Sequence, residues 1–187
     1  MTLSALSDRP FELLVALEQR ARAAIASRDG RDEQGEEWIG VGFKLGQDSF
    51  VTARSDVREV LSVPDLMTRV PGARPWLRGI ANVRGQLITI VDLKAFLGGG
   101  ISMTDRRARV LVVASRDVPT GTLVDEVVGF RRFNSTEYTD ELPATIIRCE
   151  DYLDGGFRRD DVAWPRFSLP RLLRTEQFFR AGKDTEA

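Results

Sequence analysis

The chain has 187 residues, enough for one domain of ordinary size or for two small subdomains that share a core. Hydrophobic residues make up 42% and charged residues 29%, which is typical of a folded protein and argues against wholesale disorder. The absence of histidine excludes Ser-His-Asp and Cys-His catalysis and His-ligated zinc, and the single cysteine, Cys149, excludes an internal disulfide. A net charge of −1 does not suggest a nucleic-acid-binding or polybasic membrane-binding protein.

Residues 1–37 differ in pattern from the rest of the chain. Apolar residues recur at spacings of three and four from Phe11 to Ile25, which predicts an amphipathic helix, and the acidic stretch 29–37 predicts a polar linker. Such a helix either packs on its own domain or docks a partner, and the sequence leaves both open. No secretory signal and no membrane-spanning run occurs, so we expect a cytoplasmic protein without direct membrane insertion.

From Trp38 onwards the pattern is that of short β-strands separated by turns. Arg84-Gly85 joins two of these strands as a hairpin, because Gly85 can adopt the positive φ that a tight turn needs. Many short strands with few helices favour small β-barrels or a sandwich. The predicted strands are residues 38–45, 50–53, 55–63, 77–83, 87–93, 109–114, 122–130, 146–148 and 162–167.

The second half of the chain repeats the pattern of the first half, with short strands separated by turns. Residues 124–128 faintly resemble residues 56–60, which indicates two related β subdomains with a boundary near 98–105. We expect 162–167 to be an edge strand broken by Pro165, since proline cannot donate to a sheet. A short last helix capped by Ser168 and a polar tail at 181–187 complete the chain.

No residue pattern matches a catalytic, metal or phosphate-binding motif. Gly40, Gly42 and Gly46 lack the spacing of a dinucleotide-binding loop. Paired carboxylates such as Glu137 and Glu141 fall in polar, turn-rich stretches, where side chains are usually solvated. The sequence therefore predicts a protein that is not an enzyme and that binds no cofactor and no metal.

Charge is unevenly distributed along the chain. Residues 69–109 carry eight basic side chains against two acidic ones, and residues 134–154 carry six acidic side chains against one basic one. These patches either steer protein partners or form a mosaic of solvated charges. The alternative function is a nucleic-acid-binding small β-barrel that uses the basic stretch 69–109, although only Trp76 and Phe96 offer aromatic rings for base stacking there.

Residues 75–93, which read PWLRGIANVRGQLITIVDL, resemble the signature of CheW-like domains, with Asn-apolar-Arg-Gly followed by an apolar strand ending in Asp-Leu. Phe43-Lys44-Leu45-Gly46 and Val124-Asp125-Glu126-Val127 resemble flanking parts of the same family. The resemblance implies a mainly β domain over 38–180. Its two five-stranded SH3-like β-barrel subdomains would pack around a shared core, with the N-terminal helix and a short C-terminal helix added.

The resemblance also implies a function. CheW-like proteins are non-catalytic adaptors that couple the cytoplasmic tip of a methyl-accepting chemoreceptor to the regulatory domain of a CheA-type histidine kinase. The N-terminal helix together with residues 37–46 and 69–72 is most similar to the PilI type, which serves type IV pilus twitching motility. We therefore expect protein partners, no nucleic acid, and recruitment of a cytoplasmic protein to membrane-associated chemosensory arrays.

In CheW-like proteins a groove between the subdomains takes the receptor's helical hairpin, and the resemblance assigns receptor binding to Val57, Glu59, Arg84 and Val110. The valines would give an apolar floor, and the charged pair would meet polar groups at the edge. From the residues alone we interpret both valines as core and Glu59 as solvated. Hairpin geometry requires Gly85 but not Arg84. The kinase-binding residues are not identified.

The chain departs from the family pattern near its end. The family has a glycine-containing strand, a turn and an apolar Leu-Asp-Leu strand, whereas residues 155–170 here contain Pro165 and Pro170. This difference places the last strand of the second subdomain in question.

Overall fold

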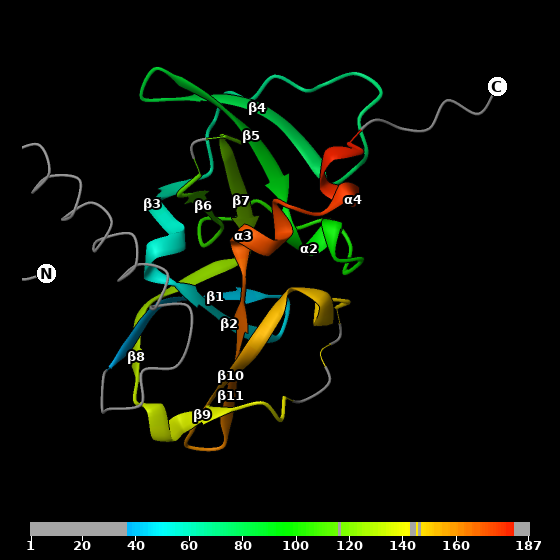
Figure 1. The fold of residues 1–187 in the computed structure, drawn as a ribbon. Helices are drawn as coiled ribbons and strands as arrows, with labels where there is room; N and C mark the ends of the chain where they lie inside the picture. Colours follow the sequence, from blue (N-terminus) through cyan, green and yellow to red (C-terminus); the bar gives the residue numbers. More distant parts are fainter. Residues whose placement is uncertain (1–36, 116, 143–144, 146, 182–187) are drawn as a thin grey trace, which may run out of the picture. The chain divides into compact units, whose positions relative to one another are not determined.

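The computed structural model describes residues 37–115, 117–142, 145 and 147–181. The amphipathic helix expected before residue 37 and almost all of the expected tail lie outside these residues. Within them the chain is mainly β, with two sheets and a few short helices (Figure 1).

The first sheet has six strands in the order β8-β1-β2-β11-β10-β9. It joins the first two described strands to the last four, and all neighbours are antiparallel except β11 and β2, which meet in parallel at Arg166 and Val51. The strands are β1 Trp38–Leu45, β2 Asp48–Ala53, β8 Glu126–Phe133, β9 Tyr138–Thr139, β10 Leu153–Arg159 and β11 Val162–Phe167.

The second sheet has five strands in the order β3-β6-β7-β5-β4. A boundary near 98–105 does not coincide with the division between the sheets, because β6 and β7 follow that point and still pair with β3 and β5. One sheet therefore has five strands and the other has six, the sixth being the two-residue β9. The strands are β3 Val57–Ser62, β4 Leu77–Val83, β5 Gln86–Asp92, β6 Arg109–Val113 and β7 Thr120–Val124.

The predicted edge position of strand 162–167 is wrong. β11 is continuous and lies inside its sheet, between β2 and β10. Pro165 is tolerated because β11 meets β2 at only one residue pair, so little depends on the N–H that proline lacks on that side.

The helices are all short. Ser168 caps α3 as expected, and its hydroxyl accepts a hydrogen bond from the Arg171 N–H at 3.4 Å. The expected single C-terminal helix is two helices of four residues each. The helices are η2 Arg54–Asp56, α2 Leu93–Phe96, η3 Ser135–Glu137, η4 Glu150–Tyr152, α3 Leu169–Leu172 and α4 Glu176–Phe179.

Three clusters of buried apolar side chains form the core of the described chain. One cluster lies inside the five-stranded sheet and includes Ile88 and Val110, and another, with Phe133 and Phe157, belongs to the six-stranded sheet. The third and largest takes side chains from both sheets and from α2, α3 and α4, and it contains Cys149. Each sheet therefore has its own core, and a shared core joins them, so the sheets pack as one body.

Candidate functional site

A tight turn between β4 and β5 presents Arg84 to solvent. Arg84 and Gly85 have φ of 51° and 84°, and Val83 pairs with Gln86 across the turn. Two successive positive φ values are typical of the type I′ hairpin, whose twist matches that of its strands. The Gly85 N–H donates to the Asn82 side-chain oxygen at 2.8 Å, which fixes the turn. Gly85 thus has the expected geometry, and the Arg84 side chain is 79% exposed.

Side chains from β3 meet this turn. The Arg84 Nη2 lies 3.2 Å from Glu59 Oε2, and the Arg58 Nη1 donates to Gln86 Oε1 at 2.8 Å. Arg58 also lies 3.6 Å from the second Glu59 oxygen. We call these four residues the Glu59–Arg84 cluster. It joins β3 to the β4–β5 turn, although β3 and β4 are opposite edges of the sheet.

The structure places the two expected valines in the core rather than on this surface. Val57 is 3% exposed and belongs to the shared core, whereas Val110 is 0% exposed and belongs to the core of the five-stranded sheet. The register of β3 against β6 shifts between Val57 and Glu59, so these residues do not follow the simple alternation of a strand. The structure therefore brings together Glu59 and Arg84 and puts the valines beneath the surface.

Sequence reasoning missed Arg58 and Gln86, which complete the cluster. Arg58 lies between Val57 and Glu59 in β3, and Gln86 directly follows the turn, so both could have been found by placing the hairpin tip against β3. The cluster is charged, its Arg84 side chain is exposed and its Glu59 side chain is partly buried, and ion pairs that solvent reaches contribute only about 0–1 kcal/mol. Its groups can therefore exchange their internal partner for polar groups of a bound protein at little loss of stability.

The basic stretch 69–109 does not present a base-stacking surface. Its two aromatic side chains, Trp76 and Phe96, are 7% and 5% exposed and pack against each other in the shared core. Single-stranded nucleic acid is bound by aromatic rings that bases can reach. The feature that the nucleic-acid alternative needed is thus absent from this part of the described chain.

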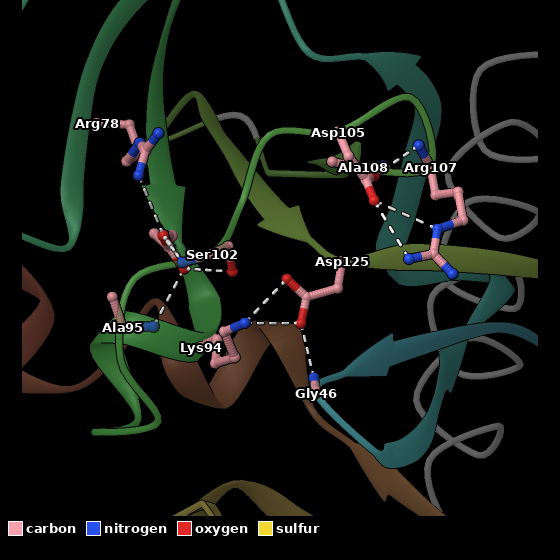
Figure 2. Close-up of polar contacts among 10 residues, drawn as sticks. Gly46, Arg78, Lys94, Ala95, Ser102, Asp105, Arg107, Ala108 and Asp125 are labelled. Carbon is pink, nitrogen blue, oxygen red and sulfur yellow. Dashed lines mark hydrogen bonds and ion pairs between the residues drawn. The ribbon is translucent and has the colours of Figure 1, made fainter.

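A buried carboxylate supports the base of the hairpin. Asp92, at the end of β5, is 0% exposed and accepts hydrogen bonds from the Ala95 N–H, the Ser102 N–H and the Ser102 hydroxyl at 3.1, 2.8 and 2.9 Å (Figure 2). The Arg78 guanidinium of β4 lies 3.5 Å away. Asp92 therefore caps α2 and ties the following loop to the hairpin.

A second carboxylate connects the two sheets. Asp125 lies between β7 and β8, and its oxygens accept from Lys94 Nζ at 3.2 and 3.0 Å and from the Gly46 N–H at 2.6 Å (Figure 2). Burial would raise the pKa of Asp125, but the Gly46 amide and the Lys94 ammonium outweigh it and hold the pKa below its usual value. The carboxylate therefore stays charged and bridges α2 to the β1–β2 turn.

The described residues hold no group of three or more carboxylates, cysteines or histidines that could bind a metal ion. No helix in this part of the chain is long and apolar enough to cross a membrane.

Residues 40–177 match the family model of the CheW-like domain. The chain belongs to this family. It is 39% identical to the protein PilI of Pseudomonas aeruginosa over 170 residues, which cover 91% of this chain and 94% of PilI. It is 30% identical to the chemotaxis protein CheW of Thermotoga maritima over 98 residues, which cover 52% of this chain and 63% of that protein.

A solved structure agrees with this membership. The fold matches the scaffolding protein TtCheW of Thermoanaerobacter tengcongensis with a TM-score of 0.65 and 25% identity, over 76% of this chain and 96% of that chain. The predicted resemblance to CheW-like domains is thus confirmed, and with it the mainly β fold of two sheets.

Proposed function

We propose that this protein is a non-catalytic adaptor that couples the cytoplasmic tip of a methyl-accepting chemoreceptor to the regulatory domain of a CheA-type histidine kinase. The observation that carries the proposal is family membership over residues 40–177, joined to 39% identity with PilI over 91% of the chain. The similarity of the fold to a scaffolding protein supports a binding role rather than a catalytic one.

The PilI identity extends the proposal to the pathway. It spans nearly the whole of both chains, whereas the match to the Thermotoga CheW spans 52% of this chain. We assign the adaptor to a chemosensory system that controls type IV pilus twitching motility. It would act in the cytoplasm, where binding to receptor and kinase recruits it to membrane-associated arrays.

The Glu59–Arg84 cluster is the proposed receptor contact. Arg84 is exposed and its partner Glu59 is within reach of the same ligand, so a helical hairpin could pair its polar groups with both. Val57 and Val110 would act from beneath by fixing β3 and β6 in position, because both are buried. In this proposal Glu59 and Arg84 contact the receptor, and Val57 and Val110 support the strands beneath them.

The test is the binding of the full chain to the helical hairpin of its own chemoreceptor. We expect Arg84→Glu to weaken this binding by about tenfold or more, because the variant places two carboxylates side by side and repels an acidic group on the receptor. Arg69→Glu is the matched control, since Arg69 is also exposed and lies in the same basic stretch. Binding by isothermal titration and folding by circular dichroism are both measured.

Two outcomes would count against this surface. Unchanged binding of Arg84→Glu would place the receptor elsewhere. A loss of cooperative unfolding in that variant would make Arg84 structural. The coupling role itself is tested separately, by whether the chain, the receptor hairpin and the kinase regulatory domain elute as one complex in gel filtration when mixed in equal amounts.

A further inference from the structure

The segment between α2 and β6 is held at both ends. Gly98 and Gly100 have φ of 81° each, which lets the chain turn sharply out of α2. Ser102 is 3% exposed and bound to Asp92 through both its N–H and its hydroxyl. Asp105 Oδ1 then accepts from the Arg107 N–H at 2.8 Å and the Ala108 N–H at 3.1 Å (Figure 2). We call residues 101–107 the pinned loop.

The inward anchor at Ser102 turns its two neighbours outward. Ile101 and Met103 stand on either side of the buried serine in the sequence, and both expose their side chains. They are 59% and 80% exposed. Single exposed apolar residues are common, but here the backbone between two of them is anchored at Ser102 before any partner binds, which reduces the backbone entropy that binding must overcome.

The turn that follows is cationic. Arg106 is exposed, and no carboxylate of the described chain pairs with its guanidinium. The Arg107 side chain is 73% exposed beside Asp105. The Arg109 Nη1 donates to the Arg106 and Ala108 carbonyls at 2.7 and 2.8 Å, so a third guanidinium lies against the same turn. The turn therefore carries three arginines and one aspartate, Asp105, which already accepts hydrogen bonds within the turn, and its net charge is positive.

We propose that the pinned loop is a docking surface for an amphipathic helix of a partner protein, with Ile101 and Met103 inserting into the apolar stripe and Arg106 pairing with acidic side chains beside it. Two neighbouring exposed apolar side chains can pack against the apolar stripe that residues at i, i+3 and i+4 form on a helix. The positive turn selects an acidic rather than a basic helix. This surface shares no residue with the Glu59–Arg84 cluster and does not depend on receptor binding.

The probe is a synthetic helical peptide of about 18 residues with one leucine stripe flanked by glutamates, and its comparator carries lysines in place of the glutamates. Binding to the full chain is measured by fluorescence anisotropy. We expect the glutamate peptide to bind, more weakly as salt is raised, and the lysine peptide not to bind. Met103→Ser and Arg106→Glu should each weaken binding by about tenfold.

Matched controls separate this surface from others. Leu66→Ser removes an apolar side chain that is 87% exposed, and Arg69→Glu reverses another exposed arginine; both should leave binding unchanged. Ser102→Ala removes one of the two hydrogen bonds that anchor the loop to Asp92, and it should weaken binding although Met103 is still present.

Any of three results would overturn the proposal: no binding of the glutamate peptide, equal binding of the lysine peptide, or equal losses in the control variants. Loss of peptide binding in Arg84→Glu would also overturn it, by moving the peptide to the Glu59–Arg84 cluster. Because the receptor hairpin is not used here, failure of this test leaves the adaptor proposal standing.

Discussion

The Asp92 carboxylate is fully buried, and groups from three segments share it. It accepts hydrogen bonds from the Ala95 N–H in α2 and from Ser102 in the pinned loop, and it forms an ion pair with the Arg78 guanidinium of β4. Removing this buried carboxylate would leave its hydrogen-bond donors without partners. An unsatisfied buried donor lowers the free energy of unfolding more than the loss of a surface contact does.

Asp92→Asn tests this role. The asparagine amide keeps the shape of the carboxylate but replaces one of its oxygens by an NH₂ group. That group is itself a donor, and it must face a donor of Ala95, Ser102 or Arg78. We expect the free energy of unfolding to fall by about 2–4 kcal/mol in urea denaturation. Asp65→Asn, at an exposed aspartate, is the control and should change it by about 0.5 kcal/mol or less. Equal effects of the two variants would show that Asp92 is not a structural anchor.

At the residue scale, the sequence alone predicted the hairpin turn but not the surface around it. Gly85 could be predicted because a two-residue turn imposes its φ locally. The burial of Val57 and Val110 was favoured by their residue type, and the structure confirms it. The pairing of Glu59 with Arg84 depends on a sheet that brings β3 to the hairpin tip, which no local pattern specifies.

Among the elements, the connection from β8 to β9 contains an ion pair to β10. Glu137, in η3, accepts from the Asn134 N–H at 2.7 Å and from the Arg159 Nη2 of β10 at 2.7 Å. The Arg159 guanidinium and the Asn134 amide lower the pKa of Glu137 to about 2. The charged carboxylate therefore stabilises the fold in a pH-dependent way.

The sign follows from the lowered pKa. The contribution of Glu137 is fully present above the unfolded value of 4.5 and is lost as the pH falls towards about 2. We expect the stability difference between the native chain and Glu137→Gln to shrink across this range. Urea unfolding at several pH values measures it, with Glu141→Gln, at an exposed position, as the control. A difference that stays constant from neutral to acid pH would contradict this account.

The junction between β7 and β8 offers a second test at this scale. Lys94→Met removes the ammonium from Asp125 and leaves that partly buried carboxylate without a cationic partner, although the Gly46 N–H still donates to it. We expect the free energy of unfolding to fall by about 1–3 kcal/mol.

Arg107→Met is the matched control for Lys94→Met, because the side chains of its pair with Asp105 are 73% and 44% exposed, and solvent screens such a pair so that its loss should barely change stability. Thermal unfolding compares the two variants, and a larger effect of Arg107→Met would show that the Lys94–Asp125 bridge does not hold the sheets together.

β11 shows where local reasoning about elements stops. A proline within a strand is usually a sign of an edge, and the prediction followed that rule. The strand is nevertheless central, because its neighbours are β10, which is adjacent in sequence, and β2, which lies more than a hundred residues earlier. Long-range pairing of this kind leaves no mark in the residues around Pro165.

At the scale of the whole molecule, the first and the last strands of the described chain lie in the same sheet. β1 and β2 pair with β8 and β11, while the residues between them build the other sheet. The predicted division into halves near 98–105 rests on a similar succession of strands and turns on both sides, but that succession does not specify which strands are neighbours in a sheet. The β class and the presence of a shared core could be predicted from strand length, turn spacing and the resemblance to CheW-like domains.

The strand pairing of the described chain predicts how a chain without the N-terminal segment would fold. The three core clusters of the described chain draw their members from residues 41–178, and the family model matches 40–177. A chain lacking residues 1–36 therefore retains β1, which pairs with both β2 and β8. We expect this truncated chain to unfold cooperatively and to bind the receptor hairpin as the full chain does, with the same sensitivity to Arg84→Glu.

Circular dichroism during heating and titration with the receptor hairpin check the truncation together. Aggregation or a broad, non-cooperative transition would mean that the N-terminal segment covers part of the core, as the packing alternative predicts. Normal folding with weakened receptor binding would instead assign the segment to the partner interface. Because each alternative alters a different measurement, the two roles left open by the amphipathic pattern of residues 11–25 can be told apart.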